Sequence, residues 1–378
     1  EPQRALANNS AIYTEKPDMG IFMEEWKSLY DSKSGERGIF NRESANMISK
    51  KNGRRETEGH AFGTNPCSEI ILRSREFCNL SEIVVRPEDT MDSLKSKVRL
   101  ATILGTFQST LTNFKYVQKD WKKNCQEERL LGVSMTGIMD SVLTNGKQSG
   151  LKERLEELKQ IAVDTNKKLA KDIGINQSVA ITCVKPSGTV SQLVDSASGI
   201  HARHNPYYIR TVRGDVKDPL SKMMKDAGFP NEEDYMNQHN VVFSFPQACS
   251  KKAVFRTDMT AIEQLEIWKT YQEHWCEHKP SVTVSVKEHE WLEVGAWVYS
   301  NFDFMSGVSF LPFTDHVYKQ APYQDCSEKE YKDLLNSMPK NVDWSKLSEY
   351  EDMDMTAGTQ TLACNASGCE VVDLTASN

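Results

Sequence analysis

Apolar residues recur along this chain with two different spacings. Several segments place them three or four positions apart, which is typical of a helix with one buried face. They are residues 12–34, 92–114, 151–169 and 261–274, with a shorter candidate at 315–319. Between them lie short runs rich in β-branched residues, which predict strands at 80–85, 179–184, 241–245, 282–286 and 307–311. Strands that alternate with helices predict an α/β sheet or barrel.

The helical segments also predict which side chains are buried. In the first segment, five apolar or aromatic residues share one face: Ile21, Phe22, Trp26, Leu29 and Tyr30. The segment 92–114 is expected to be a long and mostly buried helix, with five apolar residues: Leu94, Val98, Leu100, Ile103 and Leu104. Gly174 follows the segment 151–169 and predicts the end of that helix.

Residues 65–69, Asn-Pro-Cys-Ser-Glu, place a carboxamide, a thiol and a carboxylate together. The proline disfavours a helical conformation for Asn65, so a tight loop is expected. Alternate side chains of an extended segment point the same way, so Asn65, Cys67 and Glu69 can face one pocket. A cysteine with a nearby base is a common arrangement for nucleophilic chemistry. A second cysteine, Cys78, lies eleven positions beyond the first.

Two further segments contain glycines beside small or hydroxyl residues. The glycines of residues 129–140 favour close backbone packing over contact with a ligand. Residues 185–191, Lys-Pro-Ser-Gly-Thr-Val-Ser, follow a predicted strand and reach an expected helix start. Free N–H groups at a helix N-terminus attract phosphate, but serine and threonine there are equally typical of plain helix caps. From the residues alone, an anion site and a capped helix are equally well supported.

Histidines and cysteines raise the question of metal sites in two other places. Residues 199–210 contain two histidines, two arginines and two tyrosines, but further zinc ligands are not evident nearby, so a polar loop that lines a ligand pocket is favoured. After residue 343 the chain becomes acidic and weakly apolar, which predicts a tail that does not pack. In that tail Cys364 and Cys369 can close a disulfide loop and carry reducing equivalents by thiol exchange. A zinc half-site is the less favoured alternative.

The composition excludes several classes of function. The 378 residues have a net charge of −7 and a pI near 5.7, which argues against direct nucleic-acid binding because such proteins present basic surfaces. No apolar run approaches the ~18 residues that a membrane span needs. Nine cysteines, an odd number, indicate reduced thiols in a cytoplasmic protein. The first residue is Glu rather than Met, so we expect that further chain preceded it.

Taken together, the motifs resemble a known family. They are similar to motifs of the adenosylcobalamin-dependent (class II) ribonucleotide reductases. The motifs are Asn-Pro-Cys-Ser-Glu, the Phe-Cys-Asn-Leu-Ser context of Cys78, Lys-Pro-Ser-Gly-Thr-Val-Ser followed by Gly-Ile-His and Pro-Tyr-Tyr-Ile-Arg, and the terminal Cys-x₄-Cys. The monomeric ribonucleoside-triphosphate type is the most similar, and the chain corresponds to its C-terminal half. The resemblance implies that residues 1–343 are the C-terminal part of a ten-stranded α/β barrel with a finger loop at about 64–80. It also implies that residues 344–378 are a mobile redox tail.

The resemblance also implies roles for individual residues. Cys67 would carry a thiyl radical, with adenosylcobalamin as the cofactor, while Glu69 would be the general base and Asn65 would hold the ribose hydroxyls. Cys78 would belong to the cysteine pair that reduces the 2′ position of a ribonucleotide, with a triphosphate favoured. The tail cysteines, Cys364 and Cys369, would then reduce that pair and be reduced by thioredoxin or a similar dithiol donor. The substrate phosphates would be held by Pro186, Ser187, Gly188, Thr189, Val190 and Ser191.

The sequence departs from the family pattern in two respects. Ser68 stands where many members have glycine, a change expected only to adjust the loop. The other member of the active-site cysteine pair lies in the family's N-terminal half, and no cysteine precedes Cys67 here. The remaining cysteines are expected to be ordinary thiols: Cys125, Cys183, Cys249, Cys276 and Cys326. We therefore expect the chain to require the N-terminal half of a reductase, either removed from it or supplied by a partner in a split enzyme.

Other classes of protein stay open as alternatives. The large subunit of a diiron-dependent (class I) ribonucleoside-diphosphate reductase has similar cysteines, but it receives its radical through a tyrosine pair late in the chain. The one such pair here, Tyr207-Tyr208, lies close behind the phosphate motif. A glycyl-radical reductase is less favoured, because no Arg-Val-x-Gly-Tyr-like segment occurs near the end. The last alternative is a non-catalytic scaffold with structural cysteines.

Overall fold

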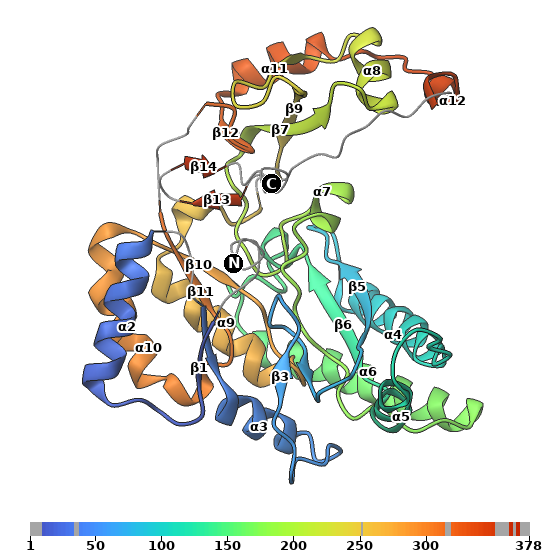
Figure 1. The fold of residues 1–378 in the computed structure, drawn as a ribbon, viewed down its shortest axis with the longest axis vertical. Coiled ribbons are helices and arrows are strands. Elements are labelled where there is room, and N and C mark those ends of the chain that lie inside the picture. The colour runs from blue at the N-terminus through green and yellow to red at the C-terminus, as the bar shows by residue number, and fades with distance from the viewer. Residues whose placement is uncertain are drawn as a thin grey trace, which may run out of the picture. The chain divides into compact units, whose positions relative to one another are not determined.

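The computed structural model describes residues 10–33, 38–250, 252–313, 319–351, 363–365 and 368–370. The chain divides into two compact units. The first unit consists of Glu1–Arg203 and Lys252–Phe313, and the second of His204–Lys251 and Thr314–Asn378. Figure 1 labels the helices and strands of both units.

Parallel strand pairs supply most of the β-structure of the first unit. They are β1 (Ser10–Tyr13) with β2 (Gly38–Asn41), β5 (Asn79–Val84) with β6 (Leu131–Thr136), and β10 (Thr283–Val286) with β11 (Ser309–Pro312). Single bridges link these pairs, between Val133 and Thr182, Val184 and Pro280, and Ile39 and Val308. The predicted α/β class is therefore confirmed, but the described strands form separate small sheets and no closed sheet.

Helices alternate with these strands. They are α2 (Met19–Ser32), α3 (Arg42–Lys51), α4 (Met91–Gln108), α5 (Lys119–Glu128), α6 (Leu151–Ile173), α7 (Val190–Leu193), α9 (Ala261–His274) and α10 (Trp291–Ser300). Short 3₁₀ turns lie at Ile138–Asp140, Arg256–Asp258, Glu288–Glu290 and Phe302–Phe304. Sequence signals explain several helix ends: Thr260 and Glu263 form a capping box on α9, and Gly174 ends α6 in a left-handed conformation.

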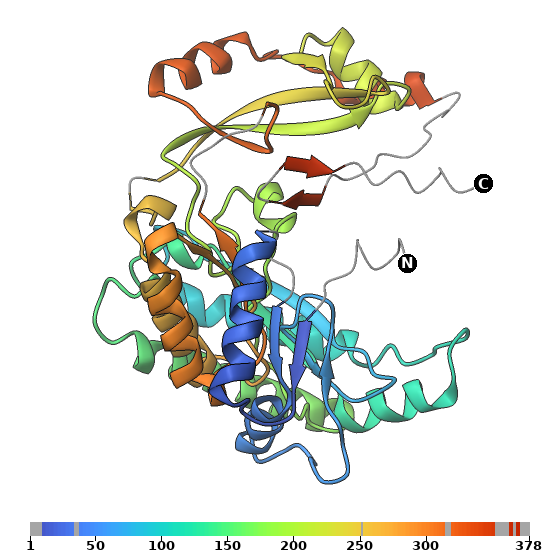
Figure 2. The same ribbon diagram turned by 60° about the vertical axis from the view of Figure 1, so that its left-hand side comes forward.

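A large core holds most helices against the strands of the first unit, and a second, smaller cluster consists of Phe40, Ala45, Phe62 and Ile71. α4 packs on β5 and β6 and beside α6 (Figure 1), and Leu94, Val98 and Leu155 are fully buried there. Figure 2 shows α2 beside α10, where the indole Nε1 of Trp26 donates a 3.0 Å hydrogen bond to the carbonyl oxygen of Trp291. No helix within the described ranges has the combination of length and apolar character that crossing a membrane requires.

Most predicted elements are present, with small shifts at their ends. The helix predicted at 261–274 coincides with α9, and the one at 151–169 continues to Ile173. Four predicted strands correspond to β5, β9, β10 and β11, whereas residues 179–184 form only the single bridges named above. The helix predicted at 315–319 lies almost wholly outside the described residues.

Two helix predictions were partly wrong. The first helix begins at Met19 rather than at residue 12, because residues 10–13 pair with β2 as a strand. Its side chain Ile21 is 53% exposed, although Phe22, Trp26 and Leu29 are buried. In α4, Leu100 and Leu104 are 66% and 63% exposed, so this helix is less buried than its composition predicted.

The second unit is built on an antiparallel sheet. Its strand order is β12 (Tyr323–Asp325), β7 (Tyr207–Asp215), β9 (Asn240–Ala248) and β8 (Asn231–Glu233). The helices are α8 (Pro219–Asp226), α11 (Glu328–Ser337) and α12 (Leu347–Tyr350), with a 3₁₀ turn at Trp344–Lys346. In the tail, β13 (Ala363–Asn365) pairs with β14 (Gly368–Glu370), and this pairing sets the backbone of Cys364 opposite that of Cys369. The domain boundary predicted at residue 343 stays a prediction.

Candidate active site

The segment 65–69 forms the tip of a small hairpin. β3 (Gly63–Thr64) and β4 (Ile71–Leu72) pair antiparallel on either side of it. Asn65 closes the tip, because its Oδ1 accepts a 3.0 Å hydrogen bond from the Ile70 N–H and its carbonyl oxygen accepts one of 2.9 Å from the Ser68 N–H. The predicted tight loop is confirmed, although it is a turn rather than an extended run. The amide nitrogen of Asn65 has no acceptor among the described residues.

Ser68 adopts a backbone conformation that favours glycine. Its φ of 61° lies in the left-handed region, which costs a side-chain-bearing residue about 1 kcal/mol or more. Its Cβ also lies 2.9 Å from the point where a Cβ would stand on Gly307, so the turn packs closely against that glycine. This geometry explains physically why glycine suits the position.

Replacing Ser68 with glycine is therefore expected to stabilise the chain by about 0.5–1 kcal/mol, through relief of the left-handed strain. Urea unfolding of the full chain measures this difference. Ser74, an exposed residue without positive φ, is the matched control, and Ser74→Gly should be neutral or destabilising. Equal destabilisation by both substitutions would contradict the strain assigned to Ser68.

Glu69 is a fully buried carboxylate with one partnered oxygen. Its Oε1 accepts a 2.8 Å hydrogen bond from the Nζ of Lys185, while its Oε2 has no partner among the described residues. Burial works against the charge of Lys185, but the hydrogen bond to Glu69 and the negative charge of that residue outweigh it and raise the pKa of Lys185. The pair is therefore an ion pair with one carboxylate oxygen left over for a ligand.

Cys67 and Cys78 are both half-buried thiols in reach of the Glu69 charge. Burial and then Glu69 raise the pKa of Cys67, with Lys185 acting in the opposite direction. Burial, Glu69 and Glu76 raise the pKa of Cys78 well above its usual value. A nucleophilic cysteine needs an environment that stabilises the thiolate. These surroundings instead keep both sulfurs as S–H groups at neutral pH.

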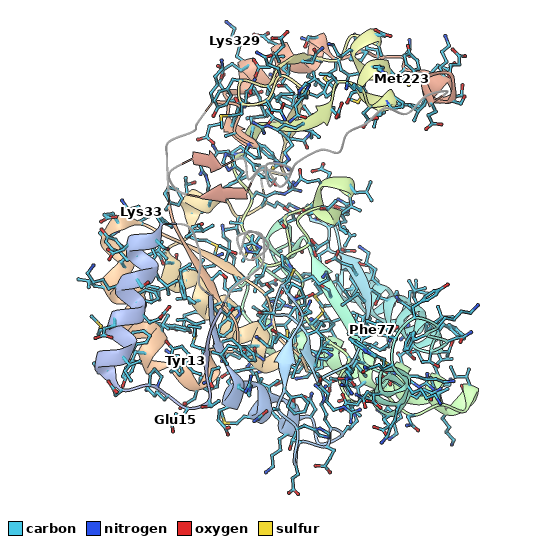
Figure 3. The ribbon with its side chains drawn as sticks, in the orientation of Figure 1. Tyr13, Glu15, Lys33, Phe77, Met223 and Lys329 are labelled. Atoms are coloured by element: carbon cyan, nitrogen blue, oxygen red, sulfur yellow. The ribbon has the colours of Figure 1, made fainter. Side chains whose placement is uncertain are left out.

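Gly132 of β6 makes room for Cys78. A Cβ on this glycine would stand 3.3 Å from the Cys78 Sγ and only 2.4 Å from the Leu80 Cδ2. Close packing, which the glycines of residues 129–140 predicted, is confirmed at this position. Cys78 itself directly precedes β5, and its neighbour Phe77, labelled in Figure 3, stacks on Trp121 of α5 with ring centroids 4.4 Å apart.

A buried ionic cluster fixes the segment between the hairpin and Cys78. Arg55 donates to Glu128 Oε2 at 2.6 Å and to Glu76 Oε2 at 3.3 Å, and all three side chains are at most 5% exposed. Burial and the neighbouring charge of Glu128 raise the pKa of Glu76 to about 8, so Glu76 is mostly protonated at neutral pH. Such a network is expensive to break, and it therefore holds Cys78 in place.

The segment 185–191 is anchored to β5 and β6 next to Lys185. The Lys185 N–H donates to Ser134 Oγ at 2.9 Å, and both Ser134 and Ser187 donate to Glu82 Oε1. The exposed backbone N–H groups of Gly188 and Thr189 have no acceptor among the described residues. The helix that follows, α7, has only four residues, so its dipole adds little.

The polar loop at 199–210 holds a histidine with a structural role. The Nδ1 of His201 lies 2.9 Å from the Ser198 carbonyl oxygen, and its Nε2 accepts a 3.0 Å hydrogen bond from the Thr283 N–H. Both ring nitrogens are thus used within the protein. Across the described ranges, no three His, Cys, Asp or Glu side chains converge as a set of metal ligands.

Sequence reasoning did not assign a role to either lysine beside the hairpin. Lys185 is the first residue of the motif Lys-Pro-Ser-Gly-Thr-Val-Ser at 185–191, so its place in this motif was a signal that it belongs to the site. Lys279 lies three residues before the strand predicted at 282–286 and is fully buried. Lys279 stands between His278 and Pro280, and this local sequence gives no signal that the lysine is buried, although a fully buried lysine is rare.

The mixed α/β fold of this chain is similar to that of a class II ribonucleotide reductase. It matches the crystal structure of a B12-dependent (class II) ribonucleotide reductase with a TM-score of 0.74 at 22% identity, over 93% of this chain and 52% of that one. The alpha subunit of the Actinobacillus ureae class Id ribonucleotide reductase matches less well, with a TM-score of 0.50 at 11% identity, over 78% of this chain and 64% of the other.

Curated relatives make the likeness more specific. The probable adenosylcobalamin-dependent ribonucleoside-triphosphate reductase of Dictyostelium discoideum is 30% identical over 82% of this chain and 40% of its own length. The adenosylcobalamin-dependent ribonucleoside-triphosphate reductase of Lactobacillus gasseri is 28% identical over 90% of this chain and 49% of its own length. No family model matches the chain. The predicted resemblance is confirmed, and the chain spans about half the length or less of these relatives.

Proposed function

We propose that this chain is the C-terminal part of an adenosylcobalamin-dependent ribonucleoside-triphosphate reductase, which reduces ribonucleotides to 2′-deoxyribonucleotides by thiyl-radical chemistry. The observation that carries the proposal is the hairpin tip. It sets Cys67, kept as a thiol, two residues from a buried carboxylate that is bound to Lys185 and has one free oxygen. Residues 64–80 would be the finger loop of an α/β barrel completed by chain outside residues 1–343, and residues 344–378 would be the redox tail.

Hydrogen-atom transfer suits Cys67 better than nucleophilic attack. Because burial and Glu69 raise its pKa, the thiol retains its hydrogen at neutral pH and can donate it as an atom. When bound, adenosylcobalamin supplies a carbon-centred radical through cleavage of its cobalt–carbon bond. The resulting Cys67 thiyl would abstract the 3′ hydrogen of the substrate ribose.

The neighbouring residues would bind and orient the ribonucleotide. The free Oε2 of Glu69 is the acceptor for the 3′-hydroxyl proton, and the free amide nitrogen of Asn65 is a donor for a ribose hydroxyl. The unpartnered N–H groups of Gly188 and Thr189 support a phosphate site in the segment Pro186–Ser191. Placing these groups to within about 1 Å is what makes such a reaction fast.

The missing half of the enzyme would lie against β5. Among the described residues β5 pairs only with β6, so its other edge is open directly beside Cys78. Apolar side chains of α4 and the loop after it are exposed as well: Leu100, Leu104, Phe107 and Leu111. An open strand edge and exposed apolar residues are costly unless covered. The N-terminal half, joined to this chain or separate, would cover them and bring the cysteine that pairs with Cys78.

The test is reconstitution of deoxynucleotide formation. The complete enzyme, meaning this chain together with its native N-terminal half, should convert ribonucleoside triphosphate to product in the presence of adenosylcobalamin and a dithiol. This chain alone should form none, because Cys78 lacks its partner. Turnover by the isolated chain would contradict the need for an N-terminal half. Absence of turnover in a complete enzyme that binds nucleotide would contradict the function itself.

A further inference from the structure

Lys279 is a fully buried lysine attached by its backbone to both sides of the candidate site. Its N–H donates a 3.0 Å hydrogen bond to the carbonyl oxygen of Glu69. Its own carbonyl oxygen accepts a 3.1 Å hydrogen bond from the N–H of Val184, the residue before Lys185. The backbone of Lys279 thus joins the hairpin tip to the segment that carries the other lysine of the site.

The ammonium group of Lys279 lies in apolar surroundings. Its Nζ is 5.1 Å from the centre of the Phe40 ring, and a Cβ on Gly307 would stand only 2.4 Å from it. The same point on Gly307 is 2.9 Å from the Cβ of Ser68. Within the described part of the chain, the Nζ has no hydrogen-bond acceptor. A buried cation in such a place is unfavourable unless a nearby anion compensates it.

The titratable groups that act on Lys279 are few. Burial lowers the pKa of Lys279 to about 7, against the opposing effects of Glu69 on the hairpin and Cys276 on its own segment. Glu69 is therefore the nearby anion, and its Oε2 is the other buried polar atom of the site without a partner. The remaining groups that the Glu69 charge reaches are Lys185, Cys67, Cys78, Glu82 and Cys183.

We propose that Lys279 is a positioning residue for Glu69, a second cation that is bound through its backbone to the hairpin tip and acts by its charge on this carboxylate beside Lys185. Lys185 is hydrogen-bonded to Oε1, so it fixes the orientation of the carboxylate. Lys279 acts by charge from an enclosed position that solvent does not reach. The proposal rests on the proposed function only in the role of Glu69 as the base.

Urea unfolding of the full chain tests the coupling without any activity. Above pH 7 the folded chain holds Lys279 mostly neutral, while the unfolded chain keeps this lysine protonated up to its usual pKa of 10.5. The unfolded state then binds more protons, so stability rises with pH in this window. Between pH 8 and 10, the unfolding constant of the wild type relative to Lys279→Met should fall by up to about tenfold per pH unit.

Removing the charge of Glu69 should shift the pH range in which Lys279 affects stability to lower pH. In Glu69→Gln the ammonium loses its compensating charge, so the rise in stability that depends on Lys279 should begin below pH 7. The matched control is Lys185→Met, because burial does not lower the pKa of Lys185 overall and its loss should leave the pH 8–10 difference intact. An unchanged slope in Lys279→Met, or an unchanged onset in Glu69→Gln, would overturn the proposal.

The pH profile of the complete enzyme tests the positioning role. Lys279→Met should lower kcat/KM about tenfold at pH 6 and much less at pH 8.5, because Lys279 carries its charge at the lower pH and is mostly neutral at the higher one. Lys159, a half-buried lysine whose pKa is lowered mainly by burial, is the control, and Lys159→Met should leave the profile unchanged. A uniform loss at all pH values would reduce Lys279 to a structural role. Absence of turnover in the wild-type complete enzyme would contradict the proposed function. The pH dependence of urea unfolding in Lys279→Met and Glu69→Gln would still decide whether Lys279 is coupled to Glu69.

Discussion

Replacing Cys67 with serine is expected to abolish deoxynucleotide formation by the complete enzyme, with a loss of at least about 10³-fold, as when a residue that acts covalently is removed. Serine preserves the size of the side chain and the turn, whose hydrogen bonds come from Asn65, Ser68 and Ile70. An O–H group does not give up its hydrogen atom as a thiol does. The measurement is product formation under saturating adenosylcobalamin and dithiol.

Cys326 is the matched control for this substitution. It is also a partly exposed free cysteine, and it lies just before α11 in the second unit, where no role in the chemistry is assigned to it. Cys326→Ser should retain full turnover. Substantial turnover by Cys67→Ser would remove the radical role from the hairpin tip and favour a structural one.

The tail cysteines should matter only for the protein reductant. Cys364→Ser is expected to abolish turnover driven by thioredoxin, because a single cysteine cannot relay two electrons by thiol–disulfide exchange. Turnover driven by a small dithiol, which reaches the Cys78 pair directly, should remain close to that of the wild type. The assay is the initial rate with each reductant in turn.

The test of the tail cysteines needs a control substitution and has one outcome that would contradict the proposal. Cys249→Ser, in a cysteine outside the tail, should leave both rates unchanged and serves as the control. If Cys364→Ser lost both rates equally, the tail would not be a shuttle. The pairing of β13 with β14 sets the backbone of residue 364 opposite that of residue 369.

Local sequence signals predicted the elements well where they were strong. The segment 261–274 carries a capping box and a regular apolar period, and it matches α9 end to end. The helix predicted at 12–34 was wrong at its start, because residues 10–13 pair as a strand with β2, which lies more than twenty residues further along the chain. Such long-range pairing overrides helical spacing, which reports only on near neighbours.

The exposure of Leu100 and Leu104 could not be predicted either, because it depends on contacts outside the helix that contains them. Apolar composition indicates that a face will be covered, but not whether the cover comes from the same chain. The ten-stranded barrel stays a prediction, because the described strands form no closed sheet. We propose that the N-terminal half of the enzyme covers Leu100 and Leu104 and completes the sheet.

Part of the candidate site was readable from sequence and part was not. Asn65, Cys67 and Glu69 lie within five consecutive residues, so their closeness along the chain was visible, while the pocket that they were predicted to share stays a prediction. The cations that act on Glu69 were not visible in this way, because Lys185 lies 116 positions along the chain and Lys279 further still. Ionic partners brought together by folding leave no local pattern. The phosphate segment lies between these cases, since its motif was visible but the helix after it proved to be four residues long.

The central claim is that a cobalamin-initiated radical on Cys67 drives ribonucleotide reduction. The most direct measurement is deoxynucleotide formation by the complete enzyme with adenosylcobalamin as the sole radical source, compared with the same mixture without it and with Cys67→Ser. The account predicts product only in the first mixture. Product that appears without adenosylcobalamin upon addition of a diiron subunit, or product from Cys67→Ser, would contradict it.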